Sequence, residues 1–354
     1  MSLDSYGGDP EIVATRNEIE RVALEIRLCA KELTAWPNLE LLLLDPLHQL
    51  QFRLASINIY QKLERLHNQC LIASESYFTT EARIHRRFEV IFIPELARLV
   101  TNIAISAGWN LDRNVSVTKV LESHAIKPNS IAAMLDRLAQ LSSKPAATIG
   151  IDLFESSTGN NIALVYVPGT QSTDFGQGEN PLDMASNIQL MAGLGDAASE
   201  RAVLLAIKQA GIESNDEVIL VGHSQGGMVA GNLAANPTGF IAAGLITFGA
   251  PIAQLRNIKA PVMALEHSND PVPNVSGKAN PLKKNWVSIQ RVSSKAESNA
   301  VLFSHSLASY KNTAVAADAS SDTGIKNIRS QLLEKLAGAK PLKSLDFRIS
   351  RESR

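Results

Sequence analysis

The stretch that decides the fold lies at residues 217–227 and reads Glu-Val-Ile-Leu-Val-Gly-His-Ser-Gln-Gly-Gly. Its apolar part, residues 218–221, has the length and composition of a buried β-strand. A segment with helical character follows immediately at residues 226–236. Between them, Gly222, Ser224 and Gly226 form a G-x-S-x-G turn, which is typical of a nucleophile elbow that presents a serine hydroxyl above the edge of a sheet. The flanking glycines are expected because Cβ atoms there would collide with the neighbouring strand and helix.

Strand-like and helix-like segments alternate on both sides of this turn. Two runs separated by a Gly/Asn turn, residues 147–156 and 161–169, predict a β-hairpin. Further strands are expected at residues 217–222, 242–249, 261–267 and 285–292, and helices at 196–211, 226–236 and 323–338. Such alternation predicts an α/β fold with a mostly parallel sheet and helices on both faces. We assign this domain to residues 146–340.

The remainder of the chain has a different pattern. Apolar residues recur at helical spacing through most of residues 10–145, so we expect an all-helical domain over residues 1–145. Residues 341–354 are basic, and we expect a flexible tail there.

Composition excludes several classes of protein. The 34 Lys and Arg residues balance 35 Asp and Glu residues, whereas a nucleic-acid binder needs a basic surplus. The two cysteines, Cys29 and Cys70, are too few for a disulfide framework, and we interpret them as buried thiols. The sequence has neither a signal-peptide pattern nor an apolar run long enough for a membrane helix. A cytoplasmic protein, or one exported without a cleaved signal, is therefore expected.

A serine nucleophile needs a base and an acid that orients the base. The serine hydroxyl is a poor nucleophile at neutral pH, and at a nucleophile elbow the acid and then the histidine follow later in the chain. Asp270 lies just after the strand at 261–267, with Glu266 as the fallback acid and a simple turn as the alternative role for Asp270. His305 is the only histidine after Asp270. We predict a catalytic set of Ser224, His305 and Asp270.

An oxyanion hole requires two N–H donors directed at the developing negative charge. The elbow supplies the backbone N–H of Gln225, and we predict the backbone N–H of Thr170 as the second donor, with an ordinary Pro-Gly turn as the alternative. Gly169 and His223 are expected to lie beside the substrate. Acyl transfer to serine by this set calls for no metal and no organic cofactor.

Five segments together resemble a known family. They are VPGTQS, VGHSQGG, LITFGAP, EHSNDPVP and HSLASY, between residues 167 and 310. In this order they are similar to the class 3 lipases of the α/β-hydrolase superfamily, over about residues 147–315. The resemblance implies an α/β-hydrolase core and an esterase or lipase acting on an acyl ester or lipid through Ser224, Asp270 and His305. Pro168 departs from the family, which usually has Arg there. The family's lid would fall in residues 173–200, which could equally be a helix packed on the sheet.

Two functional questions remain open at this level. The same residues suit an acyltransferase, and the chain could instead be a secreted or binding module with a vestigial hydrolase domain. The helical half, with Trp36 near its bend, resembles the helical hairpins exported by bacterial type VII secretion. Its alternative role is a scaffold or a module for self-association.

Overall fold

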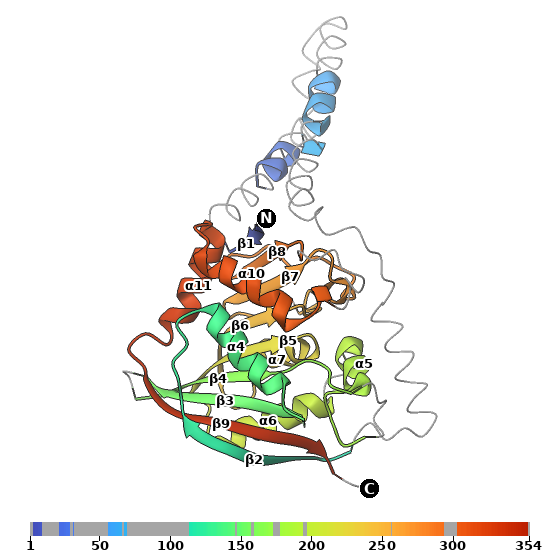
Figure 1. Cartoon of the computed structure of the whole chain (residues 1–354). Helices are drawn as coiled ribbons and strands as arrows, with labels where there is room; N and C mark the ends of the chain where they lie inside the picture. Colours follow the sequence, from blue (N-terminus) through green and yellow to red (C-terminus); the bar gives the residue numbers. More distant parts are fainter. Residues whose placement is uncertain are drawn as a thin grey trace, which may run out of the picture. The chain divides into compact units, whose positions relative to one another are not determined.

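A computed structural model of the chain provides the structure (Figure 1). The residues it describes are 3–8, 21–28, 31, 56–65, 67–68, 113–145, 147–156, 159–172, 178–193, 197–255, 257–293 and 303–352.

A nine-stranded mixed sheet forms the centre of the fold, with the strand order β1-β8-β7-β6-β5-β4-β3-β9-β2. Its strands are β1 (Asp4–Gly7), β2 (Val115–His124), β3 (Thr148–Glu155), β4 (Asn161–Val167), β5 (Glu217–His223), β6 (Ile241–Phe248), β7 (Val262–His267), β8 (Trp286–Arg291) and β9 (Lys340–Arg351). Neighbouring strands from β4 to β8 are parallel. The flanking pairs β1–β8, β3–β4, β3–β9 and β2–β9 are antiparallel. The predicted hairpin at residues 147–169 and the parallel centre are both confirmed.

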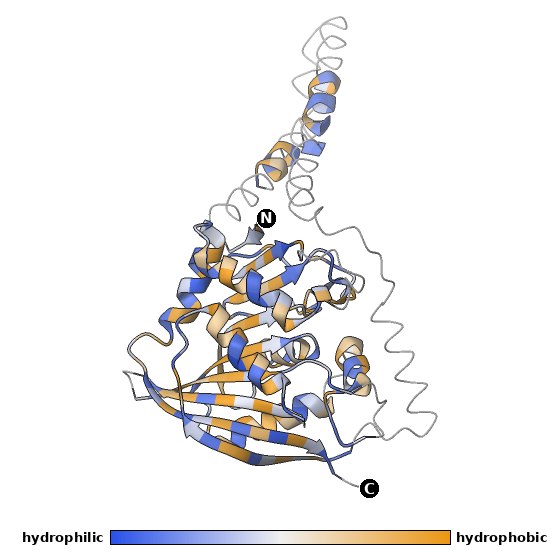
Figure 2. Cartoon of the chain, viewed as in Figure 1, coloured by the Kyte–Doolittle hydropathy of each residue, from blue (hydrophilic) through white to orange (hydrophobic). Residues whose placement is uncertain are grey.

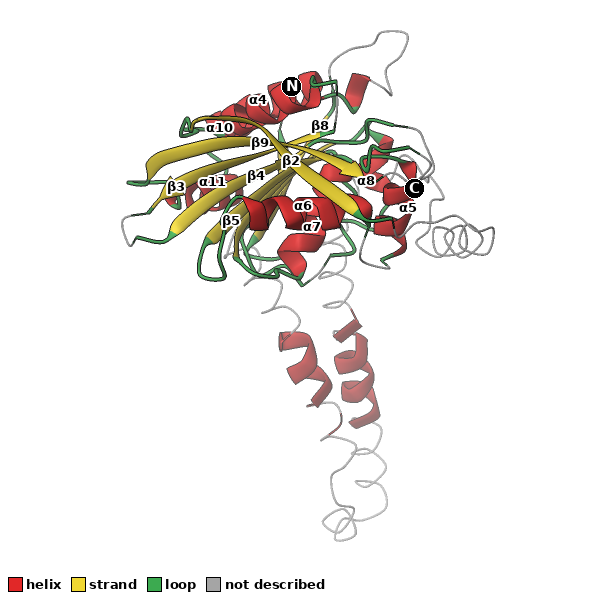
Figure 3. Cartoon of the chain, turned by 90° about the horizontal axis from the view of Figure 1, so that it is seen from below, coloured by secondary structure: helices red, strands yellow, loops and turns green. Residues whose placement is uncertain are grey.

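Helices cover both faces of the sheet, as predicted (Figure 3). They are α4 (Ile131–Ser142), α5 (Met184–Ala192), α6 (Ala198–Gln209), α7 (Gln225–Ala235), α8 (Pro271–Asn274), α10 (Leu307–Ala319) and α11 (Thr323–Glu334). On one face lie α4, α10 and α11, and on the other lie α6 and α7. The fold is therefore α/β, with a layer of helices on each side of the sheet.

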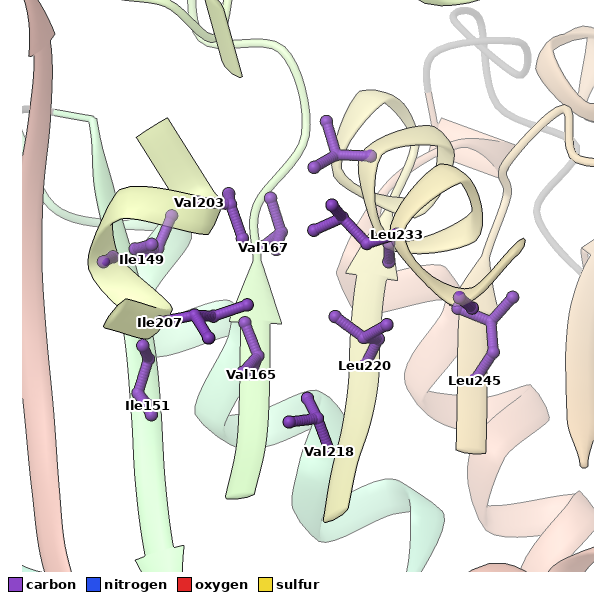
Figure 4. Packing of buried hydrophobic residues seen from close by; sticks show 14 of the residues in the cluster. Ile149, Ile151, Val165, Val167, Val203, Ile207, Val218, Leu220, Leu233 and Leu245 are labelled. Atoms are coloured by element: carbon purple, nitrogen blue, oxygen red, sulfur yellow. The ribbon is translucent and has the colours of Figure 1, made fainter. Parts of the chain in front are cut away.

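Alternation along the central strands explains the two cores. In β5, Val218 and Leu220 point to the face covered by α6 and α7, whereas Ile219 and Val221 point to the other face. Both sets are fully buried, which is why these strands read as continuous apolar runs. Figure 4 shows the first core, where Val218 and Leu220 lie among branched side chains of β3, β4, α6 and α7.

The structure corrects two predictions made from sequence. Residues 115–124, expected to be helical, form the edge strand β2. Residues 341–351, expected to belong to a flexible tail, lie in β9 inside the sheet. Each strand pairs antiparallel with the other, and β9 also pairs with β3. Polar and apolar residues alternate along both strands (Figure 2), and Leu345, Phe347 and Ile349 of β9 are buried. The alternation in β9 is present in the sequence, but the basic composition of residues 341–354 led to the prediction of a flexible tail.

The chain divides into two compact units, one formed by Met1–Asp9 with His85–Arg354 and the other by Pro10–Ile84. In the smaller unit, residues 21–28 and 56–65 are helical. Nδ1 of His67 lies 2.7 Å from the carbonyl oxygen of Ala23, so the two helical segments of this unit contact each other. The predictions for Cys29, Cys70 and Trp36 concern residues outside the described part of the chain.

Candidate active site

Ser224 occupies a strained turn between β5 and α7. Its backbone has φ 51° and ψ −122°, and it is the only residue other than glycine with positive φ in the described part of the chain. Such a conformation is nearly restricted to glycine and costs about 1–3 kcal/mol. Strain of this kind persists only where the surrounding structure imposes it, and it is concentrated at functional sites.

Neighbouring glycines make this turn possible, as the sequence predicted. A Cβ atom on Gly222 would lie 2.3 Å from the carbonyl oxygen of Gly226, at the start of α7. A Cβ atom on Gly226 would lie 2.0 Å from the carbonyl oxygen of Val167, at the end of β4. Both distances are well inside van der Waals contact with backbone that cannot move aside. The helix therefore begins directly on top of the sheet edge only because these positions lack side chains.

The three predicted side chains meet in one hydrogen-bonded line. Nε2 of His305 lies 2.9 Å from Oγ of Ser224, and Nδ1 of His305 lies 2.7 Å from Oδ2 of Asp270. They come from the end of β5, from the turn between β7 and α8, and from the turn before α10. His305 keeps 23% of its side chain exposed, whereas Asp270 is fully buried. The imidazole thus bridges a buried carboxylate and a hydroxyl, the geometry required for a proton relay.

Asp270 is held by further donors. Its Oδ1 accepts a hydrogen bond of 2.9 Å from the backbone N–H of Val272, and its Oδ2 accepts one of 2.8 Å from the hydroxyl of Tyr310. A buried carboxylate without such partners would be strongly disfavoured in its charged form. Gly249, after β6, makes room for this arrangement, since its Cβ would lie within 3.0 Å of both Asp270 and Tyr310.

Tyr310 contacts the carboxylate of Asp270 directly, and His267 supports Tyr310. Burial, and then the charge of Asp270, raise the pKa of Tyr310 well above its usual value, so its hydroxyl remains a donor. The ring of His267 stacks on Tyr310 at 3.9 Å, and the backbone N–H of His267 donates to the same hydroxyl. Burial lowers the pKa of His267. Tyr310 is the last residue of the HSLASY segment, but its role depends on a contact across forty residues, which local sequence does not show.

His223 contacts the main chain of His305. Nε2 of His223 lies 2.8 Å from the carbonyl oxygen of His305, so the neutral ring carries its proton on Nε2 and donates it. Burial, and then the proximity of His305, lower the pKa of His223 to about 4, which keeps this ring neutral at physiological pH. His223 therefore anchors the segment that carries the candidate base. Its predicted contact with substrate remains a prediction.

The predicted oxyanion loop passes beside Ser224. A Cβ on Gly169 would lie 3.1 Å from Cβ of Ser224 and 2.8 Å from Nδ1 of His223, so only glycine fits there. Oγ1 of Thr170 accepts a hydrogen bond of 2.9 Å from the side-chain amide of Asn187 in α5. Gln225 is the first residue of α7, so its backbone N–H has no partner within the helix. The assignment of Gln225 and Thr170 as donors remains a prediction.

Glu266, the fallback acid, lies elsewhere. It is buried in β7, and its Oε1 accepts a hydrogen bond of 2.7 Å from the side-chain amide of Asn280. Burial, and then the charge of Asp270, raise its pKa to about 7. The carboxylate that faces His305 is that of Asp270.

A small pocket lies between α5 and α7. Its volume is about 40 Å³, and it is lined by Leu190, Met191, Met228, Asn232, Pro251, Gln254, Leu255, Val275 and Ser276. Met228 lies one turn after Ser224, to whose carbonyl oxygen its backbone N–H donates. Leu190 and Met191 belong to α5, which packs against α7. Helix α5 lies within residues 173–200, the segment for which either a lid or a packed helix was expected.

Neither a metal cluster nor a membrane-spanning helix was found among the described residues. No group of three or more His, Cys, Asp or Glu residues there is arranged to hold a metal ion. In the same part of the chain, every helix is too short or too polar to cross a bilayer.

Comparison with known proteins adds no assignment. No protein-family model, curated protein or solved structure matches this chain.

Proposed function

We propose that this protein is a serine-dependent ester hydrolase with an α/β-hydrolase core, acting through an acyl-enzyme as the resemblance to class 3 lipases implies. The observation that carries the proposal is the line of hydrogen bonds from Ser224 through His305 to Asp270. It is supported by the strained backbone of Ser224, which has no evident structural use other than presenting the hydroxyl.

In the proposed reaction, Nε2 of His305 takes the proton of the Ser224 hydroxyl as Oγ attacks the carbonyl carbon of the ester. The carbonyl oxygen becomes an oxyanion, which the backbone N–H groups of Gln225 and Thr170 stabilise. His305 then returns the proton to the departing alcohol, and the C–O bond breaks to leave an acyl-Ser224. Water repeats the sequence and releases the acid. Asp270 fixes the tautomer of His305 and stabilises the imidazolium, without itself taking up a proton.

The pocket of about 40 Å³ is mostly apolar, and its walls come from α5, from α7, from the loop after β6 and from the segment after α8. None of Ser224, His305 and Thr170 lines it, so its volume does not set the acyl length. A rate series over p-nitrophenyl esters of increasing acyl length identifies the preferred acyl group.

The decisive experiment for the chemistry replaces the nucleophile. Ser224→Ala is expected to fold and to abolish both ester turnover and covalent labelling by a fluorophosphonate. Ser123→Ala, which changes an exposed serine of β2, serves as the matched control and should retain both. Hydrolysis retained by Ser224→Ala at the wild-type rate would refute the proposal.

A further inference from the structure

The last residue of β9 forms a buried ion pair with the segment before α5. Arg351 places one guanidinium nitrogen 2.7 Å from Oδ2 of Asp183 and another 3.0 Å from Oδ1, so the pair is bidentate. The side chains are 1% and 0% exposed. Arg351 also donates to the carbonyl oxygen of Asn180 at 2.9 Å and, through its backbone N–H, to that of Glu179 at 2.7 Å.

Asp183 is joined in turn to the predicted oxyanion loop. The carbonyl oxygen of its neighbour Leu182 accepts hydrogen bonds from the backbone N–H groups of Gln171 and Ser172, at 2.8 and 3.1 Å. The carboxylate of Asp183 caps α5 by accepting from the backbone N–H of Ser186. Asn187, one residue further along α5, donates to Thr170, the predicted oxyanion donor.

The same residue reaches the nucleophile helix. The carbonyl oxygen of Asp183 accepts a hydrogen bond of 2.9 Å from the side-chain amide of Gln225, the residue after Ser224. Asp183 therefore lies between the two segments expected to supply the oxyanion donors, Thr170 on one side and Gln225 on the other.

A buried ion pair is weak evidence for stability, because desolvation offsets much of the attraction between the charges. What a bidentate arginine–carboxylate pair does provide is fixed geometry, since two parallel hydrogen bonds allow only one orientation. The surroundings of Asp183 fit that role, because Leu182 before it and Asn187 after it form hydrogen bonds to residues 170–172.

We propose that Arg351 is a positioning residue for the active site: through Asp183 it holds residues 169–172 and Gln225 at the spacing that an oxyanion requires. This inference rests on the proposed function. Arg351 touches no reacting atom in the proposal. It acts indirectly, because the position of residues 169–172 determines how well the oxyanion of the transition state is stabilised. The C-terminal strand thereby becomes part of the active-site support.

The kinetic test compares variants of the ion pair in the full chain. Arg351→Met is expected to lower kcat for a p-nitrophenyl ester by about 10- to 100-fold, at or below the loss caused by removing one oxyanion donor, with KM changed less than about threefold. Arg351→Lys keeps the positive charge but loses the bidentate guanidinium group. Its kcat should therefore lie between that of Arg351→Met and that of the wild type. Arg348→Met removes an exposed cation from the same strand and serves as the matched control.

Arg351→Met removes the bidentate cationic partner of the buried carboxylate of Asp183, which endangers folding. The double variant Arg351→Met/Asp183→Asn removes both charges while Asn retains an oxygen for capping α5. It is expected to fold and to show the same fall in kcat. Wild-type kcat in the double variant, with cooperative unfolding, would overturn the proposal and assign the pair a purely structural role.

A second measurement does not depend on activity. Hydrogen exchange of the backbone amides of Gln171 and Ser172 should be slow in the wild type and faster in Arg351→Lys and in the double variant, whereas the amides of β5 should stay protected. Unchanged exchange at these amides overturns the inference. If the wild type neither turns over esters nor reacts with a fluorophosphonate, the proposed function fails, and the exchange result still decides whether the ion pair holds the loop.

Discussion

The hydroxyl of Tyr310 donates a hydrogen bond to Oδ2 of Asp270, the same carboxylate oxygen that faces Nδ1 of His305. One oxygen thus accepts from the candidate base and from a buried phenol. The phenol is itself fixed, because it stacks on His267 and accepts from the backbone N–H of that residue. Tyr310 therefore helps to hold this carboxylate oxygen where it contacts the imidazole of His305.

Tyr310→Phe removes one donor from Asp270 and the acceptor of the His267 N–H. We expect the free energy of unfolding to fall by about 1–3 kcal/mol, the cost of leaving buried polar groups unpaired. We expect kcat to fall by about tenfold, since a misoriented carboxylate supports the imidazolium less well. Chemical denaturation and ester kinetics measure the two effects. Tyr166→Phe, which changes a comparably buried tyrosine of β4, is the control, and equal kcat losses in both variants would contradict the prediction.

His223→Gln tests the role of the neutral ring. The pKa of His223 is lowered to about 4 in the folded state, so between about pH 6.5 and 4 the unfolded chain binds more protons and stability falls as the pH falls. Gln retains an N–H for the carbonyl oxygen of His305 but does not titrate. The variant should therefore lose less stability across this range, by up to about 3 kcal/mol. Denaturation at pH 7 and pH 4 measures this, with His124→Gln on β2 as control. Parallel losses in variant and wild type would disprove it.

Glu266 should change the stability of the wild type with pH in the opposite direction to His223, and Glu266→Gln tests this. The pKa of Glu266 is raised to about 7, so its folded form binds the proton more tightly, and stability falls as the pH rises from about 4.5 to 7. Gln preserves an oxygen for the amide of Asn280 without carrying a charge. The variant should exceed the wild type in stability at pH 8 by about 3 kcal/mol, and this advantage should vanish near pH 4. An advantage that is the same at both pH values would exclude titration of Glu266 as its cause.

Ser224→Gly and Ser224→Ala should differ in stability although both lack the nucleophile. Ala keeps the Cβ atom at φ 51°, whereas glycine adopts this backbone without strain. We expect Ser224→Gly to be more stable by about 1 kcal/mol, because relief of strain exceeds the larger loss of backbone entropy. Thermal unfolding of the two inactive variants measures the difference. If Ser224→Ala is the more stable of the two, the strain at the elbow is negligible.

Local sequence was sufficient for the centre of the fold. The central strands are buried on both faces, so β4, β5 and β6 read as apolar runs, and the helices between them carry their own periodicity. The glycines of the elbow were equally readable, because the collisions that exclude side chains at Gly222 and Gly226 occur within the turn and at its neighbouring strand. Ser224 followed from the elbow motif, Asp270 from its place after a strand and His305 from chain order, and the structure brings the three together.

The edges of the sheet and the surroundings of the site depend on contacts between distant parts of the chain. Strand β9 is held by β2 and β3, each far from it in sequence, so its charged composition misled a local interpretation. Tyr310 gains its role from Asp270, and Arg351 from Asp183.

The sequence by itself determined the α/β architecture and the identity of the candidate catalytic side chains, because periodicity and turn chemistry act over a few residues. Only the tertiary structure decided which residues hold those side chains in place. A hydrogen bond or an ion pair between two distant residues depends on the packing of the whole sheet, and no local pattern encodes that packing.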